Sequence, residues 1–174
     1  MVANRHLALV GLPGTGKSTI GRVVARRLSL QLVDLDALIA QRQGRSIPEL
    51  FAADGEAGFR ALETDALRDA LGRTDPVLLA CGGGVVLAEE NRSLLAERAL
   101  TLWLTAPLDV LADRLRRSPT GRPLLKGDMP TRLAALAAER EPLYRELADL
   151  VIDVSGQPAD IVEHILSAVG EQAT

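Results

Sequence analysis

Apolar residues follow two different spacings along the chain. Five short runs are almost continuously apolar, whereas the longer stretches between them repeat apolar residues every three or four positions. A short continuous run is typical of a strand buried on both faces of a parallel sheet, and the longer spacing is typical of a helix with one buried face. The strands predicted in this way are residues 6–10, 30–34, 76–81, 100–104 and 150–154.

Helices are predicted between these strands. They cover residues 19–28, 37–43, 56–71, 89–97, 107–116, 131–149 and 159–169. Pro142 is expected to interrupt the sixth of them, because proline removes a backbone donor from the helix interior. A further short helix is predicted to begin at Ser46, because Ser46 and Glu49 have the spacing of a capping box.

The alternation of strands and helices predicts an α/β fold of three layers, with helices on both faces of a central, mostly parallel sheet of five strands. The chain of 174 residues contains no repeat or linker, so we expect one domain over residues 1–174. Ligands of such sheets collect beyond the carboxyl ends of the strands. Residues 117–130 break the alternation with three prolines and two glycines, which favours a mobile lid.

Charge and composition argue against several classes of protein. A formal net charge of −3 gives no general attraction to nucleic acid or to an anionic membrane. The single cysteine, Cys81, excludes an internal disulfide and a cluster of thiolate metal ligands. No apolar run approaches the roughly 20 residues that a membrane-spanning helix needs. We therefore expect a cytoplasmic protein that binds neither nucleic acid nor membrane.

Residues 11–18, here called the phosphate loop, fit the pattern G-x-x-x-x-G-K-[ST] at every fixed position. They lie between a predicted strand and a predicted helix, which is the context that the motif requires. The glycines allow backbone N–H groups to turn toward phosphate oxygens, Lys17 supplies a mobile positive charge, and Ser18 offers a hydroxyl to Mg²⁺. The alternative is a glycine-rich turn that arose by chance.

Asp34 and Asp36 come at the end of the second predicted strand. In an extended chain, residues two apart point to the same side, so both carboxylates are expected to face one site. One of them would hold the water shell of Mg²⁺, and the other would accept a hydrogen bond from a substrate hydroxyl and take its proton. The alternative is that either aspartate caps the helix that follows.

Three consecutive glycines, Gly82, Gly83 and Gly84, follow the third predicted strand. Without Cβ atoms they allow a ligand to approach the backbone and to be held by N–H groups. A flexible exit from the strand is the alternative.

Arginines are harder to interpret, because 18 of the 20 basic residues are arginine. A substrate carboxylate needs a bidentate guanidinium, and phosphoryl transfer gains from an arginine near the developing charge. Arg60, Arg122 and Arg140 are candidates, but from the residues alone a solvated surface position is the simpler interpretation of any one of them. The two histidines, His6 and His164, lie in apolar patterns and are interpreted as structural.

Taken in order, these motifs resemble the shikimate kinase family. The elements that carry the resemblance are the phosphate loop, Asp34-x-Asp36, Phe59-Arg60, the three glycines, Arg122-Pro123-Leu124-Leu125 and Glu139-Arg140-x-Pro142-Leu143-Tyr144. Together they span nearly the whole chain. The resemblance implies a P-loop NTPase fold like that of the nucleoside monophosphate kinases, and transfer of the γ-phosphoryl group of ATP to the 3-hydroxyl of shikimate.

The resemblance also implies individual roles. The residues implied to bind ATP are Gly14, Thr15, Gly16, Lys17, Ser18, Thr19, Arg117 and Arg122, the last from the lid. The residues implied to bind shikimate are Asp36, Arg60, Gly82, Gly83, Gly84 and Arg140. Lys17, Asp36 and Arg122 are implied to be catalytic. Mg²⁺ would be ligated by Ser18 and, through water, by Asp34.

A helical region over residues 37–72 is implied to bind the acceptor. Its apolar wall would include Pro13, Phe51 and Phe59, although core packing explains the two phenylalanines equally well. Glu63 lies one helical turn beyond Arg60 and is placed to orient it. We expect a monomer that works on small molecules.

Two other functions fit part of the pattern. One is a related small-metabolite kinase, such as one for gluconate, whose own carboxylate could also use an arginine clamp. The other is a nucleotide-regulated binding module or GTPase switch, which lacks support because no Asn-Lys-x-Asp motif for guanine occurs.

Overall fold

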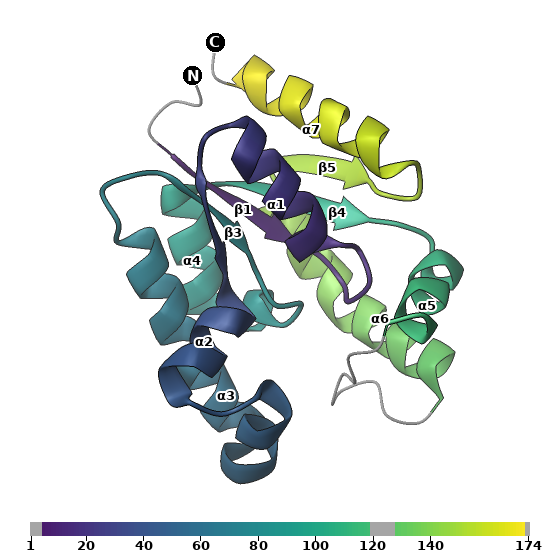
Figure 1. Cartoon of the computed structure of the whole chain (residues 1–174). Helices are drawn as coiled ribbons and strands as arrows, with labels where there is room; N and C mark the ends of the chain where they lie inside the picture. The colour runs from purple at the N-terminus through teal and green to yellow at the C-terminus, as the bar shows by residue number, and fades with distance from the viewer. Residues whose placement is uncertain (1–4, 119–127, 173–174) are drawn as a thin grey trace.

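The computed structural model describes residues 5–118 and 128–172, which form a parallel sheet of five strands between two layers of helices (Figure 1). The strands are β1 (His6–Val10), β2 (Gln31–Asp34), β3 (Val77–Ala80), β4 (Ala99–Thr105) and β5 (Leu150–Asp153). The helices are α1 (Lys17–Arg27), α2 (Leu35–Gln43), α3 (Ile47–Leu71), the 3₁₀ helix η1 (Val85–Leu87), α4 (Glu89–Arg98), α5 (Leu108–Arg116), α6 (Met129–Leu147) and α7 (Pro158–Gln172). The predicted α/β class and the five strands are confirmed.

The strand order is β2-β3-β1-β4-β5, and every neighbouring pair is parallel. The central strand β1 is buried along its whole length, as its continuous apolar run requires. Ala80 of β3 is level with Leu9 of β1 on one side and with Asp34 of β2 on the other. The segments that follow these three strands therefore leave the sheet at the same level.

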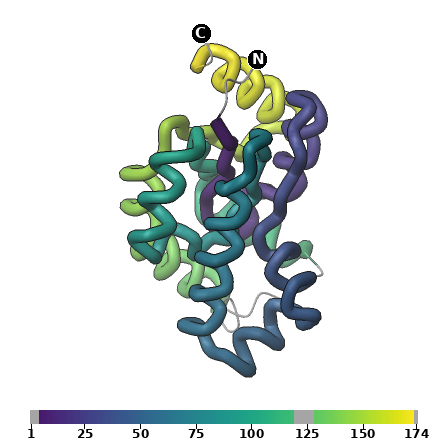
Figure 2. Tube along the Cα trace, turned by 90° about the vertical axis from the view of Figure 1, so that its left-hand side faces the viewer, coloured from purple at the N-terminus to yellow at the C-terminus, as the bar shows by residue number. Residues whose placement is uncertain are grey.

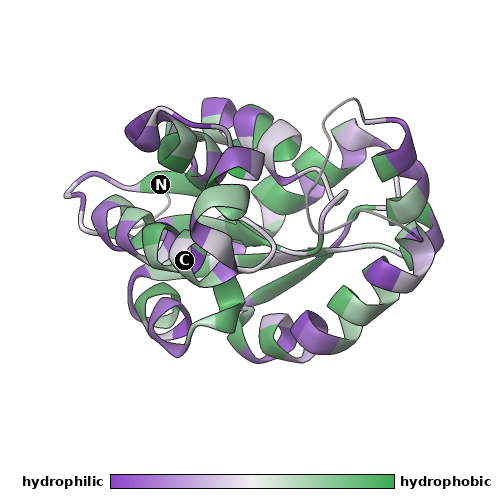
Figure 3. Cartoon of the chain, turned by 90° about the horizontal axis from the view of Figure 1, so that it is seen from below, coloured by the Kyte–Doolittle hydropathy of each residue, from purple (hydrophilic) through white to green (hydrophobic). Residues whose placement is uncertain are grey.

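Helices cover both faces of the sheet. On one face α1 packs against β3 and against α7, and on the other α4 and α6 pack against β4 and against each other (Figure 1). A Cβ atom on Gly21 of α1 would lie 3.1–3.3 Å from side-chain carbons of Leu78, Leu32 and Leu9, so glycine allows this helix to approach the sheet closely. Coloured by hydropathy, the strands are green and the outer faces of the helices carry the purple residues (Figure 3).

Helices α2 and α3 extend from the β2 edge, and the first part of α3 lies at the opposite end of the molecule from α7 (Figures 1 and 2). The predicted capping box at Ser46 is present, with both reciprocal hydrogen bonds to Glu49. Gly55 adopts φ 69° within α3, which separates a short first part from the long second part. The predicted helix over 56–71 is that second part.

One local prediction was wrong, and one short element was not predicted. Helix α6 continues through Pro142 without interruption, because tertiary packing of buried residues on both sides, such as Ala137 and Tyr144, holds the helix together despite the missing N–H. The 3₁₀ helix η1, which follows the three glycines, was not predicted.

The predicted lid over 117–130 falls largely on residues 119–127, which lie outside the described residues, and Arg122 lies there as well. No helix among the described residues is long and apolar enough to cross a membrane.

Candidate active site

The phosphate loop connects β1 to α1 in a conformation that only glycine adopts readily. Gly11 has φ 146°, and a Cβ atom there would lie 2.4 Å from the backbone oxygen of Leu104. Gly16 caps α1 with φ 85°, in the left-handed region. The loop thereby turns over the N-terminus of α1, where first-turn N–H groups and the helix dipole favour an anion.

Lys17 lies across this loop. Its Nζ donates hydrogen bonds to the carbonyl oxygens of Gly11 (2.7 Å) and Leu12 (3.0 Å) and to the hydroxyl of Thr15 (3.3 Å). Thr15 itself is buried and donates to the Leu12 carbonyl, so its side chain supports the loop. The ammonium group is thus held at the mouth of the loop, where a phosphate would be bound.

Asp34 contacts both the loop and the next helix. Its Oδ2 accepts a hydrogen bond from the Ser18 hydroxyl at 2.5 Å, and its Oδ1 accepts one from the backbone N–H of Ala37 at 3.1 Å, which caps α2. The capping role of Asp34 is confirmed. Its other oxygen contacts Ser18, and the role of Asp34 toward Mg²⁺ stays a prediction.

A cleft of about 200 Å³ opens above these residues. It is lined by Gly14, Gly16, Lys17, Ser18, Thr19, Asp34, Asp36, Ala80, Cys81, Gly82 and Gly83. Both aspartates face it, but for a different reason from the one predicted: β2 ends at Asp34, and Asp36 lies in the first turn of α2. The prediction that both aspartates lie in extended chain was wrong, because β2 ends at Asp34, which caps the helix that follows.

The three glycines form a tight turn, here called the glycine turn, between β3 and η1. The N–H of Val85 donates to the Gly82 carbonyl at 3.1 Å, so the segment is an ordered turn and not a flexible exit. Charged groups crowd each glycine. A Cβ atom on Gly82 would lie 3.0 Å from Oδ1 of Asp36, and one on Gly84 would lie 2.3 Å from Cζ of Arg60.

Gly83, in the middle of the turn, lies between the phosphate loop and α6. A Cβ atom there would lie 3.2 Å from a terminal nitrogen of Arg140 and 3.4 Å from both the Gly11 carbonyl oxygen and Cδ of Pro13. The phosphate loop and Arg140 therefore meet at Gly83.

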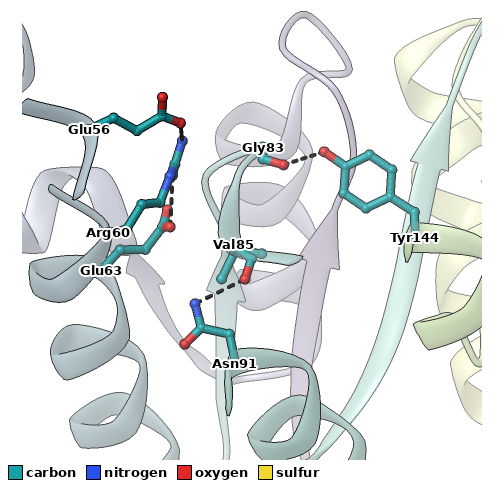
Figure 4. Close-up of polar contacts among 7 residues, drawn as sticks. All are labelled: Glu56, Arg60, Glu63, Gly83, Val85, Asn91 and Tyr144. Atoms are coloured by element: carbon teal, nitrogen blue, oxygen red, sulfur yellow. Dashed lines mark hydrogen bonds and ion pairs between the residues drawn. The ribbon is translucent and has the colours of Figure 1, made fainter. Parts of the chain in front are cut away.

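Arg60 is held by two carboxylates of its own helix. It pairs with Glu63 at 2.8 Å and with Glu56 at 3.4 Å (Figure 4). The Glu63 side chain is completely buried, and this burial raises its pKa, although the positive charge of Arg60 and the hydrogen bond from it act in the opposite direction. The predicted contact between Glu63 and Arg60 is confirmed.

Several buried polar atoms around the turn have no hydrogen-bond partner among the described residues. They include Nε of Arg60, Nε of Arg140 and Oε2 of Glu63. Arg140 is only 2% exposed, although its guanidinium is always charged. Unsatisfied buried donors on two arginines are unusual in a structural core, and they are consistent with a site for an anionic ligand.

The two predicted wall phenylalanines stack on each other, with ring centroids 4.5 Å apart. Phe59 is buried in the core, and the guanidinium of Arg60 lies 5.3 Å from its ring centroid. Phe59 is therefore a core residue that also contacts Arg60.

Two of the predicted ATP-binding residues that the structure describes, Thr15 and Arg117, are not part of the cleft lining. Arg117 follows the last turn of α5, is 82% exposed at its side chain, and lies 3.6 Å from Asp113. Helix α5 does reach the phosphate loop, because a Cβ atom on Gly14 would lie 3.1 Å from Cγ of Leu115.

Tyr144 belongs to the motif that contains Arg140, but the sequence assigned it no role. Its hydroxyl donates a hydrogen bond to the Gly83 carbonyl, and the residue is fully buried (Figure 4). The spacing of four residues from Arg140 indicates only that the two residues share a helix face. The contact with Gly83 depends on the fold.

No group of three or more His, Cys, Asp or Glu side chains that could hold a metal ion occurs in the described part of the chain. The oxygen pair of Ser18 and Asp34 nevertheless fits Mg²⁺, which is usually held by one or two protein oxygens, waters and substrate phosphates.

The family model for shikimate kinase matches residues 13–170. A shikimate kinase of Halorhodospira halophila is 46% identical over 96% of this chain and 94% of its own length, and one of Geobacter sulfurreducens is 47% identical over 96% and 92%. The solved shikimate kinase of Acinetobacter baumannii in complex with shikimate superposes with a TM-score of 0.92 at 34% identity, covering 98% of this chain and 95% of that one.

A gluconokinase of Sinorhizobium meliloti superposes with a TM-score of 0.69 at 20% identity over 98% of this chain and 94% of that one, a likeness of fold alone. On the family match and on the identity to relatives over nearly their whole length, this chain belongs to the shikimate kinase family.

Proposed function

We propose that the chain transfers the γ-phosphoryl group of ATP to the 3-hydroxyl of shikimate, giving shikimate 3-phosphate and ADP. The observation that carries this proposal is the convergence of Arg60 and Arg140, from two different helices, on a glycine turn beside a phosphate loop. Support comes from the relatives, which are named shikimate kinases, and from the solved relative that binds shikimate.

The acceptor is bound by charge and by backbone. Arg60 and Arg140 pair with the shikimate carboxylate, and Gly82, Gly83 and Gly84 contribute backbone contacts. Arg140 is already desolvated in the folded protein. An anion that binds beside it therefore gains the attraction of its charge without a further cost of removing that charge from water. An uncharged polyol would offer no carboxylate to either guanidinium group.

The donor is bound by the phosphate loop. The residues proposed to contact ATP are Gly14, Thr15, Gly16, Lys17, Ser18 and Thr19, with Arg117 at adenine and Arg122 on the lid. The Lys17 ammonium group contacts loop oxygens at 2.7–3.3 Å, and it exchanges these for phosphate oxygens when the nucleotide binds.

Mg²⁺ is proposed to be held by the Ser18 hydroxyl and, through water, by Asp34, whose carboxylate lies 2.5 Å from that hydroxyl. When bound, the ion neutralises charge on the phosphates during transfer. Asp34 keeps its second oxygen on the N-terminus of α2, so the carboxylate is fixed in orientation before any ligand binds.

Chemistry in this site depends mainly on positioning and charge. Asp36 lines the cleft next to Gly82, and its carboxylate accepts a hydrogen bond from the 3-hydroxyl. As the bond from the substrate oxygen to phosphorus forms and the bond to the ADP oxygen breaks, Asp36 takes the hydroxyl proton. Lys17 and Arg122 stabilise the negative charge on the phosphoryl oxygens.

A coupled assay of ADP release with shikimate, gluconate and other hydroxy acids tests the proposal. We expect turnover that requires ATP, Mg²⁺ and shikimate together. Turnover with gluconate but not with shikimate, or GTP hydrolysis without any acceptor, would refute it.

A further inference from the structure

We infer that Tyr144 is a positioning residue for the acceptor: its hydroxyl ties the glycine turn to α6, so that the turn and Arg140 meet the acceptor as one rigid surface. This inference rests on the proposed function, because it assigns Tyr144 to the site where the acceptor carboxylate is bound.

The contact itself is direct. The Tyr144 hydroxyl donates to the carbonyl oxygen of Gly83, from the side of the turn opposite Arg60 (Figure 4). Arg140 and Tyr144 are four residues apart on α6 and so share one face of the helix. The Arg140 guanidinium also reaches Gly83, 3.2 Å from the position of a Cβ atom there. One helix therefore contacts the same glycine with two side chains.

Fixing this carbonyl also fixes a donor. The peptide unit between Gly83 and Gly84 is planar, so the carbonyl oxygen of Gly83 and the N–H of Gly84 point in opposite directions. With the oxygen directed at Tyr144, the N–H is directed away from α6, toward the side on which Arg60 lies. Glycine peptides rotate easily, and a buried hydrogen bond is the means of holding one orientation.

The tyrosine ring is itself held in place. Tyr144 has no solvent exposure, and its ring packs against Trp103 of β4 with centroids 6.0 Å apart. Burial raises the pKa of the phenol well above its usual range, so the hydroxyl stays protonated and remains a donor to the Gly83 carbonyl. The Arg140 charge and a hydrogen bond with that residue lower the pKa in part.

A purely structural role is the competing explanation, because buried carbonyls are normally paired. The chain offers a matched case in the same region: Nδ2 of Asn91 donates to the Val85 carbonyl at 2.9 Å, also buried, one residue beyond the glycine turn (Figure 4). Asn91 lies on α4, and its acceptor Val85 does not line the cleft, whereas Gly83 does. Both are buried hydrogen bonds from a side chain to a backbone carbonyl, but only the one from Tyr144 is made to a residue of the proposed site.

The test compares Tyr144→Phe with Asn91→Ala. We expect Tyr144→Phe to raise the KM and the calorimetric Kd for shikimate about 5- to 30-fold, with kcat and the Kd for ADP within about threefold of wild type. Asn91→Ala should lower the Tm but leave the Kd for shikimate within about twofold. Equal losses for ADP and shikimate in Tyr144→Phe, or no loss for either, would overturn the inference.

A second measurement does not depend on a substitution of residue type. Tyr144 is the single tyrosine of the chain, so biosynthetic incorporation of 3-fluorotyrosine labels this position alone. We expect its ¹⁹F resonance to shift on adding shikimate and to respond much less to ADP. If this resonance does not shift on adding shikimate although the enzyme phosphorylates shikimate, the positioning role of Tyr144 is refuted and the proposed function is not. A wild-type chain that neither binds nor phosphorylates shikimate would overturn the proposed function and this inference together.

Discussion

Single residues in this site carry charges that the fold has already taken out of water. Arg140 is 2% exposed and Glu63 is fully buried, and each leaves one polar atom without a partner among the described residues. Desolvated charges are costly unless they are paired. Glu63 is paired with Arg60, whereas the unpartnered buried donor of Arg140 is best explained by a bound anion.

Replacing Arg140 by alanine should weaken shikimate far more than ADP. Losing a charge-assisted contact costs on the order of 1.5–3 kcal/mol, which is roughly 10- to 150-fold in Kd. Isothermal titration with each ligand measures this. Arg145→Ala is the matched control, because Arg145 lies on the same helix but over the Trp103 ring, 5.7 Å from its centroid. Equal losses for both ligands in Arg140→Ala would contradict the assignment.

Replacing Glu63 by glutamine should change the pH dependence of stability. Burial raises the pKa of Glu63 above 4.5, so the folded state binds this proton more tightly than the unfolded state. The stability that Glu63 contributes is therefore fully present below about pH 4.5 and is lost as the pH rises through the folded pKa. Urea unfolding across this window should show Glu63→Gln gaining on wild type as the pH rises. Parallel curves would show that Glu63 is not responsible.

At the level of elements, the glycine turn decides how the arginines are placed. Gly84 has φ −90° and ψ 3°, which alanine adopts without strain, so glycine is needed there for space alone. The space is filled by the end of the Arg60 side chain, which is flexible and can move. A methyl group at this position should therefore displace Arg60 and leave the fold intact.

We accordingly expect Gly84→Ala to raise the Kd for shikimate about tenfold or more, equal to roughly 1.4 kcal/mol. Gly44→Ala is the contrasting variant, because Gly44 has φ 61° and open space around it. It should lose about 1–2 kcal/mol of stability and keep its affinity for shikimate. Thermal unfolding and titration of both variants measure this; the reverse pattern would show that Gly84 does not make room for Arg60.

Elements with one dominant local cause could be predicted from the sequence. The five strands are short apolar runs buried from both sides, and the capping box at Ser46 consists of contacts three residues apart. In both cases the residues that determine the element lie within it or within a few positions of it. The phosphate loop is of the same kind, because its glycines are required by torsions within the loop itself.

Elements decided by packing could not be predicted. Helix α6 passes through Pro142 because its buried face outweighs one missing hydrogen bond. The Tyr144–Gly83 hydrogen bond joins residues 61 positions apart, so periodicity gives no indication of it. The residues alone do not distinguish Arg60 and Arg140 from the other arginines of the chain. The family resemblance names them, and the fold brings both to the glycine turn.

The whole molecule brings the donor and acceptor sites together through its strand order. Strand β3 lies between β1 and β2, so the phosphate loop, Asp34 and the glycine turn leave the sheet side by side. Helices α3 and α6, distant in the sequence, then bring Arg60 and Arg140 to the same turn from opposite sides. We therefore propose that one cleft binds both substrates, with Asp36 at their junction.

A crystal structure with ADP and shikimate tests this central claim most directly. We predict that the β-phosphate of ADP lies in the phosphate loop over α1, that the shikimate carboxylate lies between Arg60 and Arg140, and that the 3-hydroxyl faces Asp36. Shikimate bound elsewhere, or bound here with its carboxylate away from both arginines, would contradict it.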